Sequence, residues 1–439
     1  MLSKFWRYFL FFFFVIAFLI AAPAVVFYTA GYRFNLSTGQ VAQTGLLSIT
    51  SIPKGADITI DDEKKAERTP SIINNAVPGI HRVHLKKEGY STWEKQLEVN
   101  SRQSTFVSDA VLFLLETETV DPEIFDQAEV DPVFGTIAFL KEGRELWLKL
   151  PFSSQTVSLL GISKKKFETA EIVWSPLGRF LLFTTVSNKI SQSLLIDTQT
   201  KEIWTVPIQT SFLFDVGDSL SGYLLNDGVI SKVNFRTHES TKLPFSAQAI
   251  RSDGNNTFVV QNNPEHSVLS QIDQQGVAQI LAYLPLGEYQ FEQTPNDFLL
   301  LRDKSRERLL LVDRSGGSEP ILLLADADTW DWSPSGTDLI FSDGFGIELY
   351  KTLSHTRETI TRLSEPIHQL LWYPLGNVIA YQTATQIVAL EMDRRGEQNK
   401  TVLLRGPSFK QFWFDENGQW LEAFFQGEGT VLLRKQLQK

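Results

Sequence analysis

The sequence predicts an all-β protein with an N-terminal transmembrane helix, a small antiparallel β domain and a β-propeller of seven or eight blades. Three observations carry this prediction: an uncharged apolar segment near the start, short alternating segments after it, and a motif that recurs about every 40 residues over the rest of the chain. A chain of 439 residues is long enough for two or more domains.

The composition excludes several classes of function. Hydrophobic residues make up 43% and charged residues 21% of the chain, which is ordinary for a globular protein and argues against general disorder. The net charge of −10 opposes electrostatic binding of nucleic acid. The chain has no Cys, which excludes disulfides, thiolate metal ligands, cysteine nucleophiles and a lipidated cysteine.

The first element is the apolar segment at residues 9–28. No charged residue lies between Arg7 and Arg33, and a helix of this length covers about 30 Å, the thickness of a bilayer core. Lys4 and Arg7 precede the segment, so the positive-inside rule places the N-terminus in the cytoplasm. We expect residues 1–34 to be a cytoplasmic stub and a single-pass anchor in the cytoplasmic membrane, with the bulk of the chain outside the cytoplasm.

A cleavable signal peptide is the competing interpretation of this segment. The stretch Ala22-Pro23-Ala24 has small residues of the kind at which signal peptides are cut. The apolar run continues beyond it, through Val25 to Phe27, and is long for a signal. A retained anchor is therefore favoured.

The second element, residues 46–115, alternates between apolar and polar side chains in short stretches. This period of two, interrupted by turns with Pro, Gly or Asn, is typical of an antiparallel sheet with one buried face. The stretches PKGADITIDD from Pro53, TPSI from Thr69 and VPGIHRVHLKKEGYSTW from Val77 resemble the PEGA domain, a small all-β module named for a Pro-x-Gly-Ala turn. Lys54 stands where the family motif has Glu. The resemblance implies an extracytoplasmic interaction module without known catalytic residues.

His81 and His84 form an H-x-x-H pattern in this domain. On a strand, residues at an odd separation point to opposite faces of the sheet. Because HRVHL alternates as a strand does, we expect structural roles for both imidazoles and assign no metal site to them.

The third element, residues 120–439, contains an internal repeat with a Trp-Ser-Pro-x-Gly box. Clear copies begin at Trp174, Trp332 and Trp372, and a worn copy begins at Phe414. Degenerate copies lie near the remaining multiples of 40 and before the first clear copy, at Val130, Phe214, Ile250 and Phe291. Eight copies of four short strands predict eight propeller blades, or seven if the weak first or last copy only closes the ring.

A second marker keeps the same register. Turns led by Asp follow short apolar runs at Asp197, Asp273, Asp313 and Asp393, at separations close to multiples of 40.

The Trp-Ser-Pro-x-Gly box resembles the propeller repeat of the TolB family, which implies protein–protein contact or association with the cell wall. We expect the Trp, Pro and Gly of each box to pack between blades.

No local catalytic motif is present in the sequence. It has no G-x-S-x-G, no phosphate loop, no dinucleotide fingerprint and no H-E-x-x-H. Asp326, Asp328 and Asp331 resemble part of a calcium loop but lack its Gly and later Glu, which favours a solvated turn. We assign no catalytic, cofactor-binding or metal-ligating residue and expect no enzyme and no cofactor.

The favoured function is a membrane-anchored extracytoplasmic binding or scaffold protein of the cell envelope. The expected partners are the lipid bilayer, through residues 9–28, and an envelope protein or cell-wall glycan that binds the propeller. The alternative is an exported propeller enzyme that acts on glycans or peptides. Close carboxylates, His or Tyr with shifted pKa values at one channel end would favour the enzyme, and an apolar patch with a polar rim would favour a partner surface.

Overall fold

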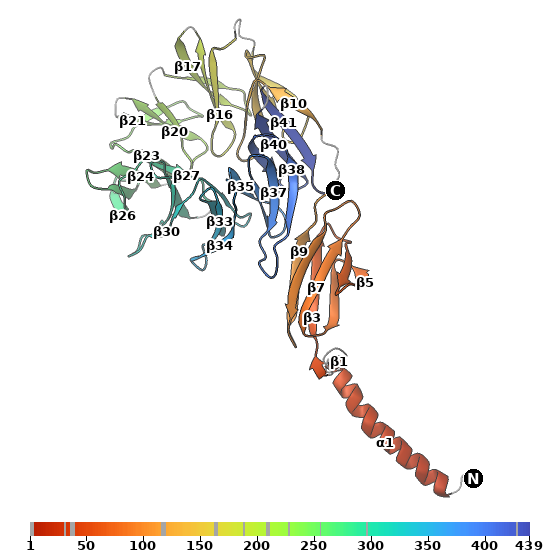
Figure 1. The fold of residues 1–439 in the computed structure, drawn as a ribbon. Helices are drawn as coiled ribbons and strands as arrows, with labels where there is room; N and C mark the ends of the chain where they lie inside the picture. The colour runs from red at the N-terminus through yellow and green to blue at the C-terminus, as the bar shows by residue number, and fades with distance from the viewer. Residues whose placement is uncertain are drawn as a thin grey trace.

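The computed structural model describes most of the chain, and its elements follow one another along an elongated molecule. Figure 1 shows an isolated helix at one end, a small sandwich of two β-sheets in the middle and a ring of sheets at the other end. The described residues are 4–29, 32–35, 40–115, 120–161, 166–187, 189–207, 211–226, 229–254, 256–295, 297–426 and 429–439.

The helix α1 (Lys4–Thr29) is continuous, with Pro23 inside it. Its segment Tyr8–Thr29 is long and apolar enough to cross a membrane, and none of the other described residues buries it. A hairpin of β1 (Tyr32–Asn35) and β2 (Gln40–Gln43) follows the helix.

The small domain is a sandwich whose two sheets face each other across one apolar core. Every second residue of β3 (Gly45–Ile52) and β8 (Trp93–Val99) is buried, as the alternation in the sequence predicts. The core includes Leu47 and Ile49 from one sheet and Val83 and Leu85 from the other. The first sheet has the order β6 (Ser71–Ala76), β3 (Gly45–Ile52) and β9 (Ser104–Val111), and the second β5 (Glu63–Arg68), β4 (Asp57–Ile60), β7 (Gly79–Lys86) and β8 (Trp93–Val99).

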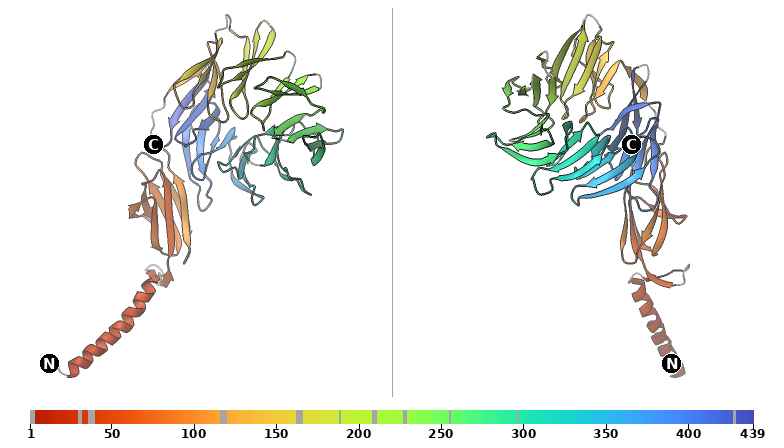
Figure 2. Two further views of the ribbon diagram at one scale, coloured as in Figure 1. Left: turned by 180° about the vertical axis from the view of Figure 1, so that it is seen from behind. Right: turned by 60° about the vertical axis from the view of Figure 1, so that its left-hand side comes forward.

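The large domain is an eight-bladed β-propeller, because its strands form eight four-stranded antiparallel sheets around a ring (Figure 2). Blades 1 to 4 consist of β11 (Gln127–Val130), β12 (Ile137–Lys141), β13 (Glu145–Lys149), β14 (Thr156–Leu160); β15 (Thr169–Trp174), β16 (Phe180–Ser187), β17 (Ile190–Asp197), β18 (Ile203–Val206); β19 (Ser211–Phe214), β20 (Ser221–Asn226), β21 (Val229–Asn234), β22 (Ser240–Lys242); and β23 (Ala249–Asp253), β24 (Asn256–Asn262), β25 (Ser267–Ile272), β26 (Ala278–Leu284). Blades 5 to 7 consist of β27 (Tyr289–Glu292), β28 (Phe298–Asp303), β29 (Arg308–Asp313), β30 (Ile321–Asp326); β31 (Thr329–Trp332), β32 (Asp338–Ser342), β33 (Gly346–Lys351), β34 (Thr356–Arg362); and β35 (Gln369–Trp372), β36 (Val378–Gln382), β37 (Gln386–Glu391), β38 (Lys400–Arg405).

Blade 8 closes the ring with strands from two distant parts of the chain. It combines β39 (Phe409–Phe414), β40 (Trp420–Gln426) and β41 (Thr430–Gln436) with β10 (Val120–Phe125), which pairs antiparallel with β41. This pairing supplies the fourth strand of the last blade. The described strands therefore form eight blades, which confirms the larger of the two predicted numbers.

One cluster of buried apolar side chains lies between each pair of consecutive blades, and eight such clusters complete the circle. The cluster between blades 8 and 1 includes Phe125, Phe139 and Trp413. The ring is therefore held by packing between neighbouring sheets as well as by the β10–β41 pairing.

The Trp residues of the repeated box connect consecutive blades. Trp174 Nε1 donates to the backbone oxygen of Glu129 in blade 1 at 3.1 Å, and Trp332 Nε1 donates to that of Gln293, next to blade 5, at 3.3 Å. The expected packing between blades is confirmed for the Trp of these two copies, which lie in or against the buried clusters between their blades.

Candidate functional site at the domain junction

The segment after β9 joins the sandwich to blades 7 and 8. Val111 and Phe113 belong to the buried cluster between these blades, and the ring of Phe113 packs edge-on against Tyr373 at a centroid distance of 5.2 Å. Leu114 N donates to Leu437 O at 3.0 Å. Val111 and Phe113 are therefore part of the propeller core, where they join the sandwich to blades 7 and 8.

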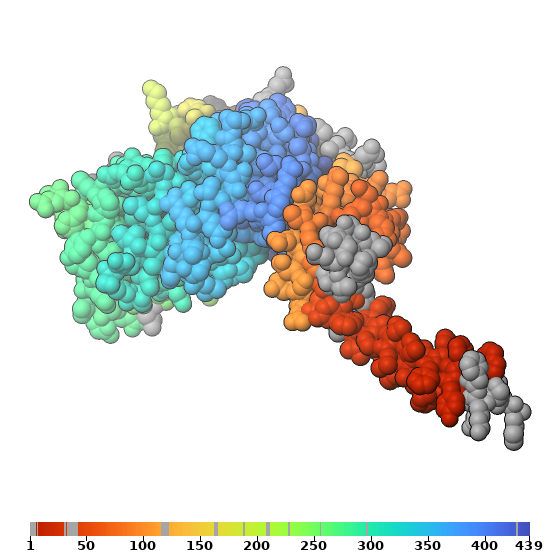
Figure 3. Space-filling view, turned by 60° about the horizontal axis from the view of Figure 1, so that its bottom comes forward, coloured from red at the N-terminus to blue at the C-terminus, as the bar shows by residue number. Residues whose placement is uncertain are grey.

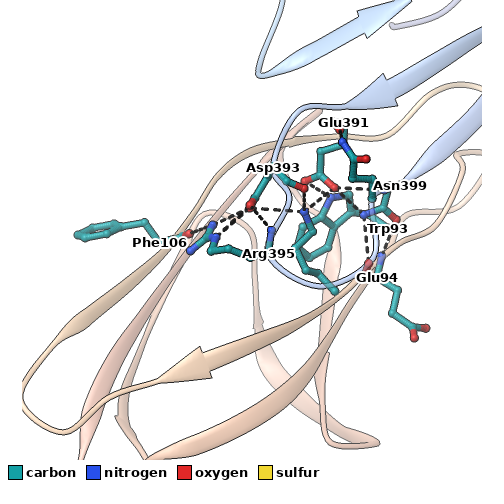
Figure 4. A network of polar contacts seen from close by, with 9 residues as sticks. Trp93, Glu94, Phe106, Glu391, Asp393, Arg395 and Asn399 are labelled. Carbon is teal, nitrogen blue, oxygen red and sulfur yellow. Dashed lines mark hydrogen bonds and ion pairs between the residues drawn. The ribbon is translucent and has the colours of Figure 1, made fainter. Parts of the chain in front are cut away.

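A buried ion cluster forms the centre of the junction (Figure 4). Lys95 comes from β8, and its side chain has no exposed surface; its Nζ lies 2.8 Å from Glu391 Oε2 and 3.4 Å from Asp393 Oδ2. The same Nζ donates to Asp393 O at 2.7 Å, and Trp93 Nε1 donates to Glu391 Oε1 at 3.0 Å. Because a buried ammonium is costly unless it is paired, these contacts fix β8 against the end of β37.

Asn399 and Arg395 extend the cluster to the backbone of the sandwich. Asn399 Nδ2 donates to Glu94 O at 3.0 Å, while Asn399 Oδ1 accepts from Glu94 N at 3.1 Å. Arg395 donates to Phe106 O at 2.7 Å and pairs with Asp393, also at 2.7 Å (Figure 4). One loop of blade 7, residues 392–399, thus contacts both sheets of the sandwich.

Two glycines permit this close approach. Gly396 has a φ of +66°, and a Cβ at this position would lie 3.0 Å from Gln96 O. Gly376 in the box of blade 7 has a φ of +68°, and a Cβ there would lie 2.9 Å from Asp109 O. Both positions need a residue without a side chain, for the backbone conformation and for the neighbouring domain.

The charges of the cluster lower the pKa of Asp393. Burial by itself would raise the pKa of this carboxyl, but hydrogen bonds from Arg395 and the positive charges of Lys95 and Arg395 outweigh burial and hold it below its ordinary value of 3.8. Asp393 is therefore ionised at neutral pH.

A cavity of about 250 Å³ lies beside the cluster, between β9 and blade 7. Its lining includes Asp109, Asn377, Thr401 and Arg395. The acids Glu391 and Asp393 at its wall are paired with Lys95 and Arg395, so they serve as ionic contacts between domains rather than as a free acid and base.

The structure gives His81 a structural role. Its Nδ1 lies 2.5 Å from Asp61 Oδ2 and its Nε2 lies 2.5 Å from Val77 O, so both ring nitrogens are engaged. His84 lies three positions further along the same strand, opposite Glu94. Among the described residues, no group of three or more His, Asp or Glu side chains is arranged to hold a metal ion.

Asp326, Asp328 and Asp331, the acids of the predicted solvated turn, form no metal-holding group in the part of the chain that the structure describes. Asp326 pairs with Arg308 at 2.7 Å. Asp331 lies in β31, where its carboxylate accepts from Trp332 N at 2.9 Å and from Trp372 N at 2.7 Å. Burial raises the pKa of Asp331 to about 7. The prediction of a solvated turn is wrong for Asp331, because this side chain bridges the inner strands of blades 6 and 7.

Other acids with raised pKa values lie on different blades. Burial raises the pKa of Glu292, in blade 5, to about 7, and it also raises the pKa of Glu129, in blade 1. Since Asp331 belongs to blade 6, these three carboxyl groups come from three separate inner strands.

The ion cluster was missed by reasoning from the sequence, although one signal was present. Trp93, Lys95, Leu97 and Val99 share one face of an alternating strand, and that face is buried. A Lys on the buried face of a strand requires an acidic partner. The identity of that partner is not visible locally, because Trp93 and Glu391 are 298 positions apart.

The comparisons with known proteins agree with the two β domains. A model of the PEGA domain matches residues 44–111. No curated protein sequence matches this chain.

Among solved structures, a eukaryotic initiation factor is 12% identical with a TM-score of 0.50, over 74% of this chain and 91% of that chain. Dipeptidyl peptidase 4 of Porphyromonas gingivalis is 12% identical with a TM-score of 0.47, over 71% of this chain and 58% of that one. An oligogalacturonate lyase in complex with manganese is 12% identical with a TM-score of 0.39, over 74% and 98% of the two chains. At these identities the likeness concerns the fold alone.

Proposed function

We propose that this protein is a membrane-anchored extracytoplasmic scaffold that presents its propeller, in a fixed orientation, to an envelope protein or a cell-wall glycan. The observation that carries the proposal is the buried cluster of Lys95, Glu391 and Asp393 at the domain junction. A domain on a flexible linker samples many orientations, whereas a buried and charged junction holds one.

Three further observations support the proposed location. The apolar side chains of α1 are uncovered all around the helix, which suits a lipid environment. The basic residues Lys4 and Arg7 precede the span, which favours a cytoplasmic N-terminus. The match to the PEGA domain supports an interaction module on the outer side. The nature of the partner, protein or glycan, rests on the resemblance of the box to TolB-like propellers.

An exported propeller enzyme is the second candidate. The pKa values of Glu292 and Asp331 are raised to about 7, a range that suits general acid–base chemistry. Asp331 is engaged by two backbone N–H groups, however, and this favours a structural role for its carboxylate.

The topology is tested with single cysteines, because the chain contains none. Leu353→Cys lies in a turn of blade 6 where the side chain is 85% exposed. We expect a membrane-impermeant maleimide to label this variant in intact spheroplasts and to label Ser3→Cys only after lysis. Labelling of Ser3→Cys alone in intact spheroplasts would overturn the orientation, and loss of an N-terminal tag from the mature protein would identify a cleaved signal.

The scaffold role is tested by crosslinking in membranes. A photoreactive residue at position 353 is expected to capture an envelope protein or a cell-wall glycan reproducibly in the wild-type background. Lys95→Met in the same background is expected to reduce this capture several-fold, because the propeller is no longer held in position. Equal capture by both variants contradicts the need for a fixed orientation.

A further inference from the structure

The end of the sandwich next to α1 carries an apolar turn. The turn between β6 and β7 contains Val77 and Pro78, and Ile80 follows it with 72% of its surface exposed. Ala76 pairs with Gly45, the first residue of β3. The turn therefore lies at the end of the sandwich where the chain arrives from the helix and the hairpin.

This end of the sandwich follows closely on the transmembrane span. Tyr32 in the hairpin packs its ring against Phe27 of α1 at a centroid distance of 5.2 Å. Arg102, in the turn between β8 and β9, donates its N–H to Thr44 O at 3.2 Å. The space-filling view shows the helix and the sandwich in direct succession (Figure 3). The β6–β7 turn thus lies at the end of the sandwich at which the chain arrives from α1.

The turn is held rigidly enough to present Ile80 in one position. His81 bridges the backbone oxygen of Val77 and the carboxylate of Asp61, each at 2.5 Å. Asp61 Oδ1 also accepts from Arg82 N at 2.9 Å. These bonds tie the β6–β7 turn to the neighbouring β4–β5 turn.

The charged residues near Ile80 indicate which part of a bilayer this end of the sandwich can contact. Asp61 and Asp62 lie in the β4–β5 turn and Glu98 lies opposite Ile80 on β8, so the acids disfavour a cluster of anionic headgroups. An exposed apolar side chain beside a bilayer gains instead by entering the boundary between headgroups and acyl chains. A single side chain binds weakly, but α1 holds this turn at the surface, where a weak contact is effectively intramolecular.

We propose that the end of the sandwich formed by the β6–β7 turn, with the exposed Ile80 at the start of β7, inserts into the interfacial layer of the bilayer that contains α1. The sandwich is then attached to the membrane by two elements, the helix and the turn, which restricts its tilt more than the helix alone does. The inference rests on the retained anchor of the proposed function.

The test uses the full-length protein in nanodiscs that hold one copy each. A fluorophore is attached to Ile80→Cys, and its quenching by nitroxides carried on lipids near the headgroups is compared with that at Ile72→Cys. Ile72 is a matched control, since it is also exposed, at 59%, on the same domain. It lies four residues from Ala76 along β6, about 13 Å farther from the membrane.

We expect the lipid-borne quencher to act several-fold more strongly at position 80 than at position 72, and not at Leu353→Cys on the propeller. Equal quenching at positions 80 and 353 overturns the inference. A shifted emission at position 80 that appears only when several copies share one liposome, without lipid quenching, also overturns it and identifies a second copy as the partner.

A label on α1 separates the failure of this inference from the failure of the proposed function. Phe18→Cys lies in the middle of α1, where the native ring is 69% exposed. Quenching at position 18 by a nitroxide deep in the acyl layer shows that the anchor is in place. If position 18 is quenched and position 80 is not, only the inference fails; if neither is quenched, the anchor fails as well.

Discussion

Lys95 of the sandwich and Glu391 of blade 7 meet at 2.8 Å, and the Lys95 side chain is completely removed from solvent. The pair joins two domains whose residues are almost 300 positions apart in the sequence. Because the Lys95 ammonium has no exposed surface and the Glu391 side chain is only 12% exposed, each charge depends on the other, and substitution of either residue tests the junction.

Removal of the ammonium is expected to destabilise the junction. Lys95→Met leaves Glu391 and Asp393 without their shared cation, at a cost of about 3–5 kcal/mol in the free energy of unfolding. Urea denaturation followed by tryptophan fluorescence measures the change, since Trp93 lies in the cluster. Lys86→Met, at an exposed position of β7, is the control and is expected to change the midpoint little. Equal midpoints for the two variants would contradict the role of Lys95.

The glycine in the blade 7 loop is expected to matter for docking as well as for backbone strain. Gly396→Ala and Gly316→Ala both place a Cβ on a residue of positive φ, at +66° and +68°. Each is expected to cost about 1–2 kcal/mol from strain. Only Gly396→Ala also meets the sandwich, because nothing lies within 4 Å of a Cβ at Gly316. Double electron–electron resonance between labels at positions 72 and 353 is expected to broaden for Gly396→Ala alone, and identical distance distributions would refute this.

Acid is expected to loosen the junction through Asp393. The pKa of Asp393 is lowered in the folded protein, so its contribution to stability is present above the ordinary value of 3.8 and is lost as the pH falls through the folded-state pKa. The same pair of labels, measured from pH 7 to pH 3, is expected to show a broader distribution only below about pH 4. Asp393→Asn removes this dependence. Asp343→Asn, which removes another carboxyl of lowered pKa in blade 6, is expected to leave it intact.

The closing strand of the ring offers a test on two adjacent residues. Phe125 is buried between blades 8 and 1, with its ring 4.6 Å from that of Phe139, whereas Ile124 is 66% exposed. Phe125→Ala is expected to lower the stability of the propeller by about 3–5 kcal/mol, and Ile124→Ala to change it by less than about 1 kcal/mol. Thermal or urea unfolding measures both variants. A similar loss in both would mean that β10 contributes by its backbone pairing alone.

The architecture could be read from the sequence because its signals are local and repeated. The boxes at Trp174, Trp332 and Trp372 fall in the same place in blades 2, 6 and 7, each at the end of an inner strand. Alternation in β8 likewise predicted a half-buried strand. Such patterns report the face and the period of an element, which are properties of a few neighbouring residues.

The junction and the role of Asp331 could not be read in this way. The carboxylate of Asp331 accepts from the backbone of Trp372, which belongs to the next blade. Lys95 is paired with Glu391 at the end of β37 and with Asp393 in the loop that follows, almost 300 positions farther along the chain. Contacts between separately folded units depend on how their surfaces dock, and no short sequence pattern encodes that geometry.

The pairing of β10 with β41 also constrains the order of events during biogenesis. Residues 120–125 leave the ribosome some 300 residues before residues 430–436, with which they pair. Until β41 has been synthesised, β10 has an unsatisfied edge that is open to the wrong strand. The backbone N–H of Leu114 likewise has its acceptor, the backbone oxygen of Leu437, near the end of the sequence. The pairing of β10 with β41 and the bond of Leu114 to Leu437 can therefore form only after the last strand has been synthesised.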